Sequence, residues 1–409
     1  MNTKRIVLVS VLCGLGYMMY SVDRMVMSSS VGLIAKELGL EKAQSGVLLS
    51  SFFYGFIAFL FIGGIFSDKF NSKSVVIIGI ALFSLFTGLT GLATGFTVLI
   101  VYRILTGVGE GVFWPAASLE IAKVTTERQR TTVMSLYWAG YPIGGFFGTW
   151  LGAIIGPLYG WRAVFYVTCF LGLIIALLYG ILIKPTQNNV SANIETSSEK
   201  VPIRIIFKQR SVILIALYYF VLLSGWWIVL LWAPTFLVTA KHMSLSVGGT
   251  IASLAGISGA IGGLLIGKYC DLGSLQRKMV VLISITVLSG LLMAAIVLDM
   301  PTWLITICIF LLGFFGYPIT PVVLAVTSNL VPKQIAGSAL GFVTNVGMAA
   351  GAISPVVLGV LSEHYQMSGI WFVAAIVMMA SIVLLFFTGK VETSMIDKEK
   401  TYDPINLKN

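Results

Sequence analysis

Five charged residues stand well inside long apolar stretches of the sequence: Glu120 in the fourth stretch, and a group of four formed by Asp23 and Arg24 in the first stretch and Arg103 and Glu110 in the fourth. A charge at the centre of a bilayer costs about 2.5 to 3.5 kcal/mol, so four unpaired charges would cost roughly 10 kcal/mol. These residues must therefore pair with one another or line a watery cavity. A guanidinium presents a planar fork of donors to a carboxylate, and a carboxylate in low dielectric can exchange a proton. Together the four side chains could bind an anion and transfer protons.

The spacing in the fourth stretch places Arg103 and Glu110 on one face of a helix. They are seven residues apart, nearly two turns, so both side chains face one direction, about 10 Å apart along the axis. Gly107, Gly109 and Gly111 lack side-chain bulk, which lets either another helix or a ligand approach the backbone. We expect Arg103 and Glu110 to line one cavity, and both uses of the glycines remain open.

The composition explains why charges at these positions are unusual. Of the 409 residues 57% are hydrophobic and only 10% are charged, and the mean hydropathy is +0.97. A bilayer core about 30 Å thick needs roughly 20 apolar residues per helix, and the sequence repeatedly supplies stretches of that length. We therefore expect an integral membrane protein, which excludes soluble enzymes and free nucleic-acid binders. The four cysteines are far apart and indicate neither a disulfide framework nor a zinc site.

The apolar runs predict an all-α polytopic membrane protein with 12 transmembrane helices in two six-helix bundles. A polar stretch at 184–210 separates an N-terminal bundle, 1–183, from a C-terminal bundle, 211–389, and a tail follows at 390–409. With both termini on one side, twenty cations share that side and four lie opposite. By the positive-inside rule the termini and the linker are cytoplasmic, in the cell inner (plasma) membrane. The predicted spans lie at roughly 6–33, 44–67, 74–95, 97–122, 131–157, 162–183, 211–240, 246–267, 279–298, 302–331, 335–362 and 368–389.

The two halves repeat a charged loop. The segment from Gly64 to Lys69, which contains Asp68, recurs as Gly267 to Asp271, and the two aspartates are 203 residues apart, close to half the chain. Two related halves of six helices indicate bundles arranged about an axis normal to the membrane. In the loop, glycines permit close helix approach, while Asp68 and the cations can cap helix ends or latch the halves.

On these residues the sequence resembles the major facilitator superfamily. The stretch from Gly63 to Lys73 looks like its loop signature between helices 2 and 3, although Asn71 and Ser72 replace the more usual glycine and basic residues. The resemblance implies a gating role for this loop, carried by Gly64, Asp68, Lys69 and, in the second half, Asp271.

A closer resemblance is carried by the charged helices. The segments Tyr20–Arg24, Ser51–Phe56 and Arg103–Glu110 look like the anion:cation symporter family, which includes bacterial sugar-acid importers, sialin and the vesicular glutamate transporters. This resemblance implies that Arg24 binds the substrate anion. It also implies that Asp23 and Glu110 are a protonatable pair and that Arg103 is the cation that tunes Glu110.

The same resemblance implies hydrogen bonds to the substrate from Tyr54 in helix 2 and Asn345 in helix 11. The alternatives are an interfacial tyrosine and an interhelical asparagine. The sequence departs from the family at Ser21, where a tyrosine is frequent; here Tyr20 stands one step earlier. This departure leaves the particular substrate open.

The second half has no charge deep within a helix, unlike carriers that face phosphate or nitrate with arginines from both halves. Its polar or aromatic lining could come from Tyr218, Tyr219, Trp226, Trp227, Trp232, Tyr317, Thr320, Thr327 and Asn345, most of which pack equally well as belt residues. We expect a secondary active transporter that takes up a small organic anion, such as a sugar acid or another carboxylate, by proton-coupled symport and alternating access.

Other classes of membrane protein would show different sequence features. Multidrug efflux, or another antiporter of the superfamily, would favour a broad apolar cavity, and a membrane sensor would need a signalling domain. We expect no enzymatic activity, no metal and no cofactor, with H+ as the coupling ion, no nucleic-acid partner, and a monomer in the lipid bilayer. The anion, the proton stoichiometry and the physiological direction stay open.

Overall fold

The structure, a computed structural model, describes residues 3–184, 209–271, 273–331 and 333–388, and these ranges contain no strand. Most of the predicted linker and the whole predicted tail lie outside them. Apolar sequence without backbone partners can cross a bilayer only as helix, because each helix satisfies its own N–H and C=O groups. The helices are α1 (Thr3–Leu38), α2 (Lys42–Lys69), α3 (Ser72–Thr90), α4 (Phe96–Val124), α5 (Glu127–Tyr159), α6 (Trp161–Leu182), α8 (Arg210–Thr239), α9 (Leu245–Asp271), α10 (Leu275–Ala295), α11 (Thr302–Gly316), α12 (Ile319–Leu330), α13 (Lys333–His364) and α14 (Met367–Ala380).

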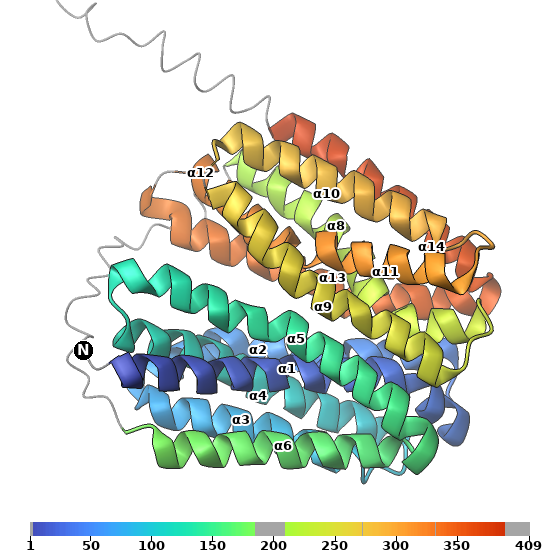
Figure 1. The fold of residues 1–409 in the computed structure, drawn as a ribbon, viewed down its shortest axis with the longest axis horizontal. Helices are drawn as coiled ribbons and strands as arrows, with labels where there is room; N and C mark the ends of the chain where they lie inside the picture. Colours follow the sequence, from blue (N-terminus) through green and yellow to red (C-terminus); the bar gives the residue numbers. More distant parts are fainter. Residues whose placement is uncertain (1–2, 185–208, 272, 332, 389–409) are drawn as a thin grey trace, which may run out of the picture.

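The helices form two groups that lie side by side. Figure 1 shows α1 to α6 on one side and α8 to α14 on the other, with the axes running in roughly the same direction. Eleven helical stretches in the described part of the chain are long and apolar enough to cross a membrane, with α11 and α12 counted as one. The 33-residue α5 packs along α1 and α9 and completes the set. The predicted all-α fold of twelve membrane-spanning helices is confirmed.

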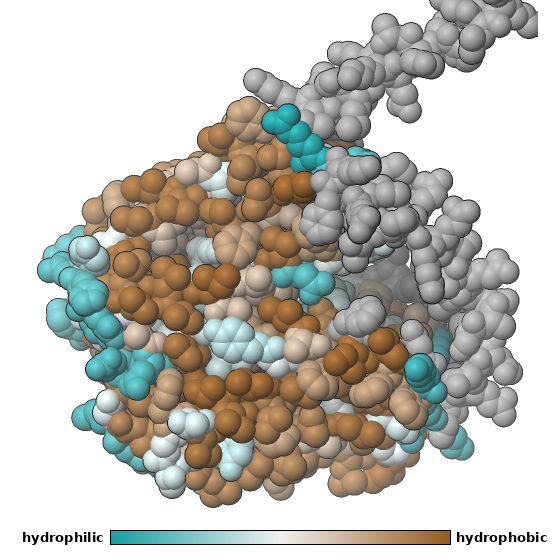
Figure 2. Space-filling view, turned by 180° about the vertical axis from the view of Figure 1, so that it is seen from behind, coloured by the Kyte–Doolittle hydropathy of each residue, from teal (hydrophilic) through white to brown (hydrophobic). Residues whose placement is uncertain are grey.

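The surface has the pattern of a membrane protein. Figure 2 shows a broad hydrophobic belt around the middle of the molecule, with hydrophilic residues gathered towards its ends. Apolar side chains are exposed along the belt, for example Phe170 on α6 and Leu264 on α9. A lipid solvent accepts such side chains, so the usual cost of exposing apolar surface to water does not apply.

Two predicted spans are interrupted. Within 368–389, α14 ends at Ala380 and helix resumes at 382–388 after a turn at Ser381, and the span 302–331 is divided as well. The sequence predicts a single helix over 302–331, but the structure divides it into α11 and α12 at Tyr317 and Pro318. Proline has no N–H to donate to the carbonyl four residues earlier, here that of Phe314. Gly262 of α9 lies against this carbonyl, so the break coincides with a close approach of two helices. The apolar run continues through the break and gave no signal of it.

Glycines of α4 set its distance from α2. A Cβ added to Gly107 would collide with the backbone of Phe52, and one added to Gly111 would lie 2.8 Å from the carbonyl oxygen of Phe56. Of the two uses that the sequence left open, close helix packing is therefore the one that the structure shows. This packing also fixes the rotation of α4, and with it the direction in which Glu110 points.

The two halves meet mainly at one end of the molecule. Between them, α2 packs against α13, α5 against α9, and α1 against α8. At the end away from the N-terminus, Lys42 Nζ donates to the carbonyl of Ser362 at 2.7 Å, and Glu363 Oε1 accepts from the backbone N–H of Ala43 at 2.9 Å. Each contact caps a helix end of one half with a side chain of the other. In Figure 1 the helices of the two halves lie closer at this end than at the end with the N-terminus.

A buried hydrogen bond crosses the same interface deeper in the molecule. Ser28 Oγ of α1 lies 3.0 Å from the carbonyl oxygen of Leu230 and 2.8 Å from that of Leu231 in α8. In a regular helix the Leu230 carbonyl would accept from residue 234, but that residue is Pro234 and has no N–H. Ser28 therefore satisfies a carbonyl that its own helix cannot, and this ties the two halves together.

We expect Ser28→Ala to weaken closure at this end. The variant leaves a buried carbonyl without a donor, so the open population should rise about three- to ten-fold relative to wild type. Spin labels at the exposed positions Leu158 and Val247, at the ends of α5 and α9, report the separation by electron–electron distance measurements. Ser29→Ala is the control, because that hydroxyl bonds only to carbonyls of its own helix. Identical distance distributions for wild type and Ser28→Ala would contradict this role.

Candidate functional site

The centre of the candidate site is a buried ion pair between α1 and α4. Arg24 donates from Nε to Glu110 Oε2 at 2.8 Å, and its Nη2 lies 2.7 Å from the same oxygen. The two side chains are 1% and 0% exposed. In this dry setting the attraction is strong, but it must repay the loss of hydration of both ions. Among the described residues, Oε1 of Glu110 has no hydrogen-bond partner.

Aromatic rings surround the guanidinium of Arg24. Its Cζ lies 4.0 Å from the ring centre of Tyr20, 4.4 Å from that of Phe52 and 4.8 Å from that of Phe56. Arg24 Nη2 also donates to the Tyr20 hydroxyl. Ring faces carry partial negative charge, so they stabilise a cation in a place that water does not reach. The rings hold the guanidinium in position beside Glu110.

Arg103 and Asp23 complete the charged set, but neither is paired within the described residues. All three Arg103 nitrogens and both Asp23 oxygens are buried without a hydrogen-bond partner. Arg103 Cζ lies 5.6 Å from the ring centre of Phe52, so this ring stands against both arginines. Asp23 lies within electrostatic range of Arg103 and Glu110 and close to the Thr87 hydroxyl of α3. With both acids ionised the four charges sum to zero.

The structure therefore brings together Asp23, Arg24, Arg103 and Glu110, as the sequence predicts. The pairing is more specific than the spacing indicated, because Glu110 turns towards Arg24 on another helix and forms no ion pair with Arg103. Helical periodicity fixes which residues share a face. It does not fix which neighbouring helix that face meets.

Tyr54 and Asn345 do not join this group. Tyr54 is 45% exposed, and its hydroxyl donates to the carbonyl of Ala352 in α13 at 3.3 Å, across the two halves. Asn345 is exposed and donates to the carbonyl of Gly341, one turn earlier in its own helix, at 3.0 Å. In this conformation neither side chain contacts Arg24, and their roles in binding remain predictions.

The predicted gating loop is only partly described. Lys69 is exposed at the end of α2, and Gly64 has open space where a Cβ would stand, so close helix approach falls on Gly63, against the backbone of Gly111. The side chains of Asp68 and Asp271 lie outside the described part of the structure. Their latching role stays a prediction.

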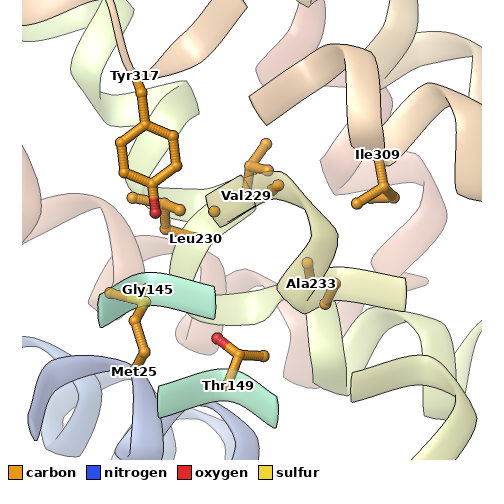
Figure 3. Close-up of a pocket in the computed structure, with 11 residues that line it drawn as sticks. Met25, Gly145, Thr149, Val229, Leu230, Ala233, Ile309 and Tyr317 are labelled. Atoms are coloured by element: carbon orange, nitrogen blue, oxygen red, sulfur yellow. The ribbon is translucent and has the colours of Figure 1, made fainter. Parts of the chain in front are cut away.

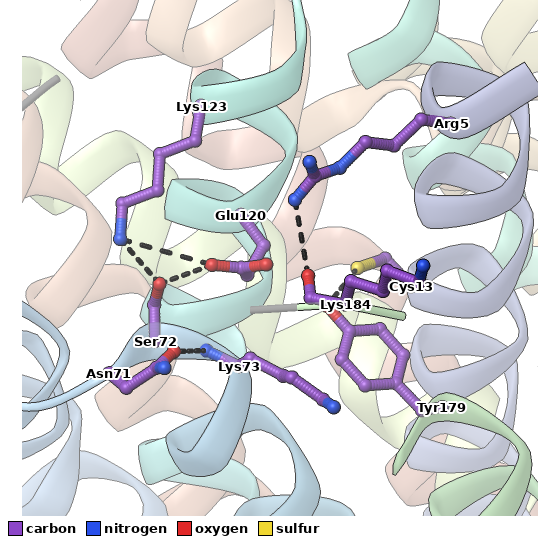
Figure 4. Close-up of polar contacts among 9 residues, drawn as sticks. All are labelled: Arg5, Cys13, Asn71, Ser72, Lys73, Glu120, Lys123, Tyr179 and Lys184. Carbon is purple, nitrogen blue, oxygen red and sulfur yellow. Dashed lines mark hydrogen bonds and ion pairs between the residues drawn. The ribbon is translucent and has the colours of Figure 1, made fainter. Parts of the chain in front are cut away.

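The two unusual residues of this loop have clear partners. Asn71 caps α3 by accepting from the backbone N–H of Lys73 at 3.0 Å. Ser72 donates to Glu120, and Lys123 Nζ donates to Ser72 Oγ at 2.6 Å and lies 3.9 Å from Glu120 Oε1 (Figure 4). Lys123 of α4 thus supplies a cation beside the position where the family signature usually has one. Glu120, the second fully buried carboxylate of α4, is held by this cluster away from Arg24.

A chain of aromatic rings runs from Arg24 to the other half. Tyr20 and Tyr141 have ring centres 6.0 Å apart, Tyr141 and Tyr317 also 6.0 Å, and Tyr317 and Trp226 5.2 Å. The buried hydroxyl of Tyr317 has no hydrogen-bond partner in the part of the chain that the structure describes. Figure 3 shows Tyr317 beside a small cavity at the boundary between the halves, which is lined by Met25, Gly145 and Leu230 among others and has a volume of about 10 Å³. That volume holds about one water molecule.

Several of these residues had no predicted role beside the charges. Tyr20 was readable, because it lies four residues before Arg24 and so on the same face of the helix. Lys123 was readable too, three residues after Glu120 on the same helix. Phe52, Phe56 and Tyr141 had no signal, since aromatic residues are common in apolar helices and nothing distinguishes the few that face a charge.

Comparisons with known proteins agree with the fold. A family model described as Major Facilitator Superfamily matches residues 13–355 and 274–404. The chain is 28% identical over 386 residues to the hexuronate transporter of Bacillus subtilis, covering 90% of this chain and 92% of that protein. It is 27% identical over 363 residues to the 3-(3-hydroxy-phenyl)propionate transporter of Escherichia coli, covering 88% and 87%.

The fold is similar to a solved transporter as well. The crystal structure of a D-xylose-proton symporter superposes with a TM-score of 0.76 at 16% identity, covering 93% of this chain and 97% of that one. The twelve-helix fold, the two groups of helices and a family match over most of the sequence all support the same assignment. This chain belongs to the major facilitator superfamily and is a membrane transporter, not an enzyme.

Proposed function

We propose that this protein is a secondary active transporter that takes up a small organic anion, a monocarboxylate, together with protons. Arg24 binds the carboxylate of the substrate, and Glu110, with Asp23, takes up and releases the protons. The halves at 1–183 and 211–389 move against each other to give alternating access. The observation that carries this proposal is the buried ion pair between Arg24 and Glu110.

The ion pair supports coupling because a substrate must compete for it. Glu110 Oε2 now occupies both donors of Arg24 that a substrate carboxylate would use. A proton on Glu110 removes the competing charge and frees the guanidinium for the substrate. By thermodynamic reciprocity, a bound substrate then favours the proton on Glu110 by the same factor. An inward proton gradient drives uptake if half-loaded states reorient slowly.

Asp23 and Arg103 provide the remaining charge compensation. Both are buried and without hydrogen-bond partners within the described residues, so each depends on the charges around it. When Glu110 is protonated, Arg103 retains Asp23 as the counter-charge of the cluster. We assign Arg103 to tuning Glu110 and Asp23 to a second protonation step.

The lining supports a monocarboxylate. All four buried charges of the site lie in the first half, and the second half contributes aromatic residues such as Tyr317 and Trp226. One arginine therefore binds one carboxylate of the substrate, and aromatic rings contact the rest of the substrate. Relatives named as transporters of a hexuronate and of an aromatic propionate both fit this scheme. We propose a carboxylate with a hydroxylated or aromatic body.

The closed end of the structure faces outwards in this proposal. If the termini and linker are cytoplasmic in the plasma membrane, the contacts of Lys42, Glu363 and Ser28 close the outer side. The conformation is then inward-facing, and release to the cytoplasm is the step it represents.

We expect Arg24→Lys to bind carboxylates about tenfold more weakly than wild type. An ammonium keeps the charge but cannot give the two donors that Nε and Nη2 give, and one charged hydrogen bond is worth about that factor. A thermal-shift screen with a hexuronate and 3-(3-hydroxyphenyl)propionate first identifies a ligand. Arg162→Lys, at an exposed ion pair with Glu37, is the control and should bind normally. Undiminished binding by Arg24→Ala would show that Arg24 does not bind the substrate.

We expect Glu110→Gln to separate binding from coupling. The amide is neutral, like the protonated acid, so counterflow exchange should persist while accumulation under a pH gradient is lost. With one proton per anion, wild type can concentrate substrate about tenfold per pH unit. Proteoliposomes are used for both measurements, counterflow exchange without a pH gradient and accumulation with an imposed pH gradient. Glu120→Gln, which changes a buried carboxylate outside the site, should still accumulate substrate. Normal accumulation by Glu110→Gln would assign coupling to Asp23 or another ion.

We expect the linker to be cytoplasmic. A single cysteine introduced at Ser197, in a background without the four native cysteines, should resist an impermeant maleimide added to intact cells and react after permeabilisation. The excess of cations on that side predicts this outcome. Reaction in intact cells would show that the linker lies outside the cell. The assigned orientation would then be reversed, and the closed end of the structure would face the cytoplasm.

A further inference from the structure

A groove opens on the lipid-facing side of the second half, between the end of α9 and the start of α10. Its volume is about 310 Å³, and its lining includes Leu265, Tyr269, Arg277, Val280, Ser284 and Phe315. The two helices touch each other little, and each packs against α11, so Phe315 of α11 forms the floor. A volume above about 300 Å³ is within the usual range of ligand sites, whereas the cavity beside Tyr317 holds only about one water molecule.

The groove changes in polarity along its length. Most of its wall is apolar, but Arg277 stands in the first turn of α10, at the end of the helix and therefore at the membrane surface. Its Cζ lies 5.3 Å from the ring centre of Tyr269 in α9, which orients the guanidinium across the mouth of the groove. Lys268, exposed beside Tyr269, adds a second cation at the same end of α9.

We propose that this groove binds an anionic phospholipid, with an acyl chain between α9 and α10 and the phosphate at Arg277. An apolar channel at membrane depth that ends in a cation at the surface matches a molecule with an acyl chain and an anionic head. A zwitterionic lipid carries its own cation next to the phosphate, so it gains less from Arg277. The site is separate from the Arg24 site, and it does not depend on which substrate is carried.

The position of the groove links it to the interface between the halves. Its wall helix α9 packs against α5, where a Cβ on Gly256 would collide with the backbone of Phe146 and Pro142. A lipid held against the other face of α9 therefore stabilises one of the helices that must move when the halves separate.

The proposal is tested on delipidated, purified protein. Native mass spectrometry after titration with phosphatidylglycerol or phosphatidylcholine gives the affinity for each lipid. We expect tighter binding of phosphatidylglycerol, and about fivefold weaker binding of it by Arg277→Ala, the usual effect of one basic residue at an anionic surface. Lys36→Ala, which removes an exposed cation at the end of α1, is the matched control and should bind like wild type.

A second pair of variants tests the acyl-chain part of the site. Ser284→Trp fills the groove and should reduce phosphatidylglycerol binding, whereas Leu288→Trp, one turn further along α10 and outside the lining, should not. Inorganic phosphate at the same concentration should raise the unfolding temperature of neither wild type nor Arg277→Ala. Equal affinity for the two lipids, wild-type binding by Arg277→Ala, or stabilisation of wild type by inorganic phosphate alone would each overturn the proposal.

Discussion

Four charged side chains share the dry interior of the first half, and the arrangement of that half follows from the need to compensate them. Arg24 and Glu110 neutralise each other directly, while Asp23 and Arg103 balance only through the group as a whole. Replacing such charges by apolar residues would often increase stability. In the proposed mechanism these charges do what the neutral residues of a packed core cannot do, namely exchange an anion and protons.

The rest of the first half supports this cluster. Close packing at Gly107 and Gly111 presses α4 against α2, which aims Glu110 at α1 and places Phe52 between the two arginines. At the other end of α4, Lys123 and Ser72 hold Glu120 in a separate cluster. Two buried carboxylates on one helix thus have different partners. The second half carries no such charge within the described helices. It contributes aromatic residues such as Tyr317 and Trp226, and the helices α8, α9 and α13 that pack against the first half.

Much of this could be predicted from the sequence, and the parts that could not share one cause. The number of spans and the depth of Arg24 and Glu110 are properties of single helices, which composition and spacing report. The repeat of the charged loop can be read by comparing one half of the sequence with the other. The pairing of Arg24 with Glu110 depends on how two helices rotate against each other, and no local pattern records that rotation. The break at Pro318 escaped for a related reason, since proline is tolerated in membrane helices when a neighbour such as α9 fits against the bend. The positions of Tyr54 and Asn345 depend in addition on which conformation the halves adopt.

Because Glu110 is attached to the same bundle as Arg24, it acts on that arginine as a tethered ligand. A tethered group competes at an effective concentration far above that of most free solutes, in the millimolar range or higher. Glu110 would then displace small inorganic anions such as chloride from Arg24, because they offer a single weak contact. No selection by size is needed for this. While Glu110 is ionised, a molecule must add contacts elsewhere, for example on the rings that lead to Tyr317, to compete with it for Arg24. In the proposed mechanism, Arg24 and its tethered partner thereby discriminate against common anions, and the leak of unselected solutes is suppressed before the halves begin to move.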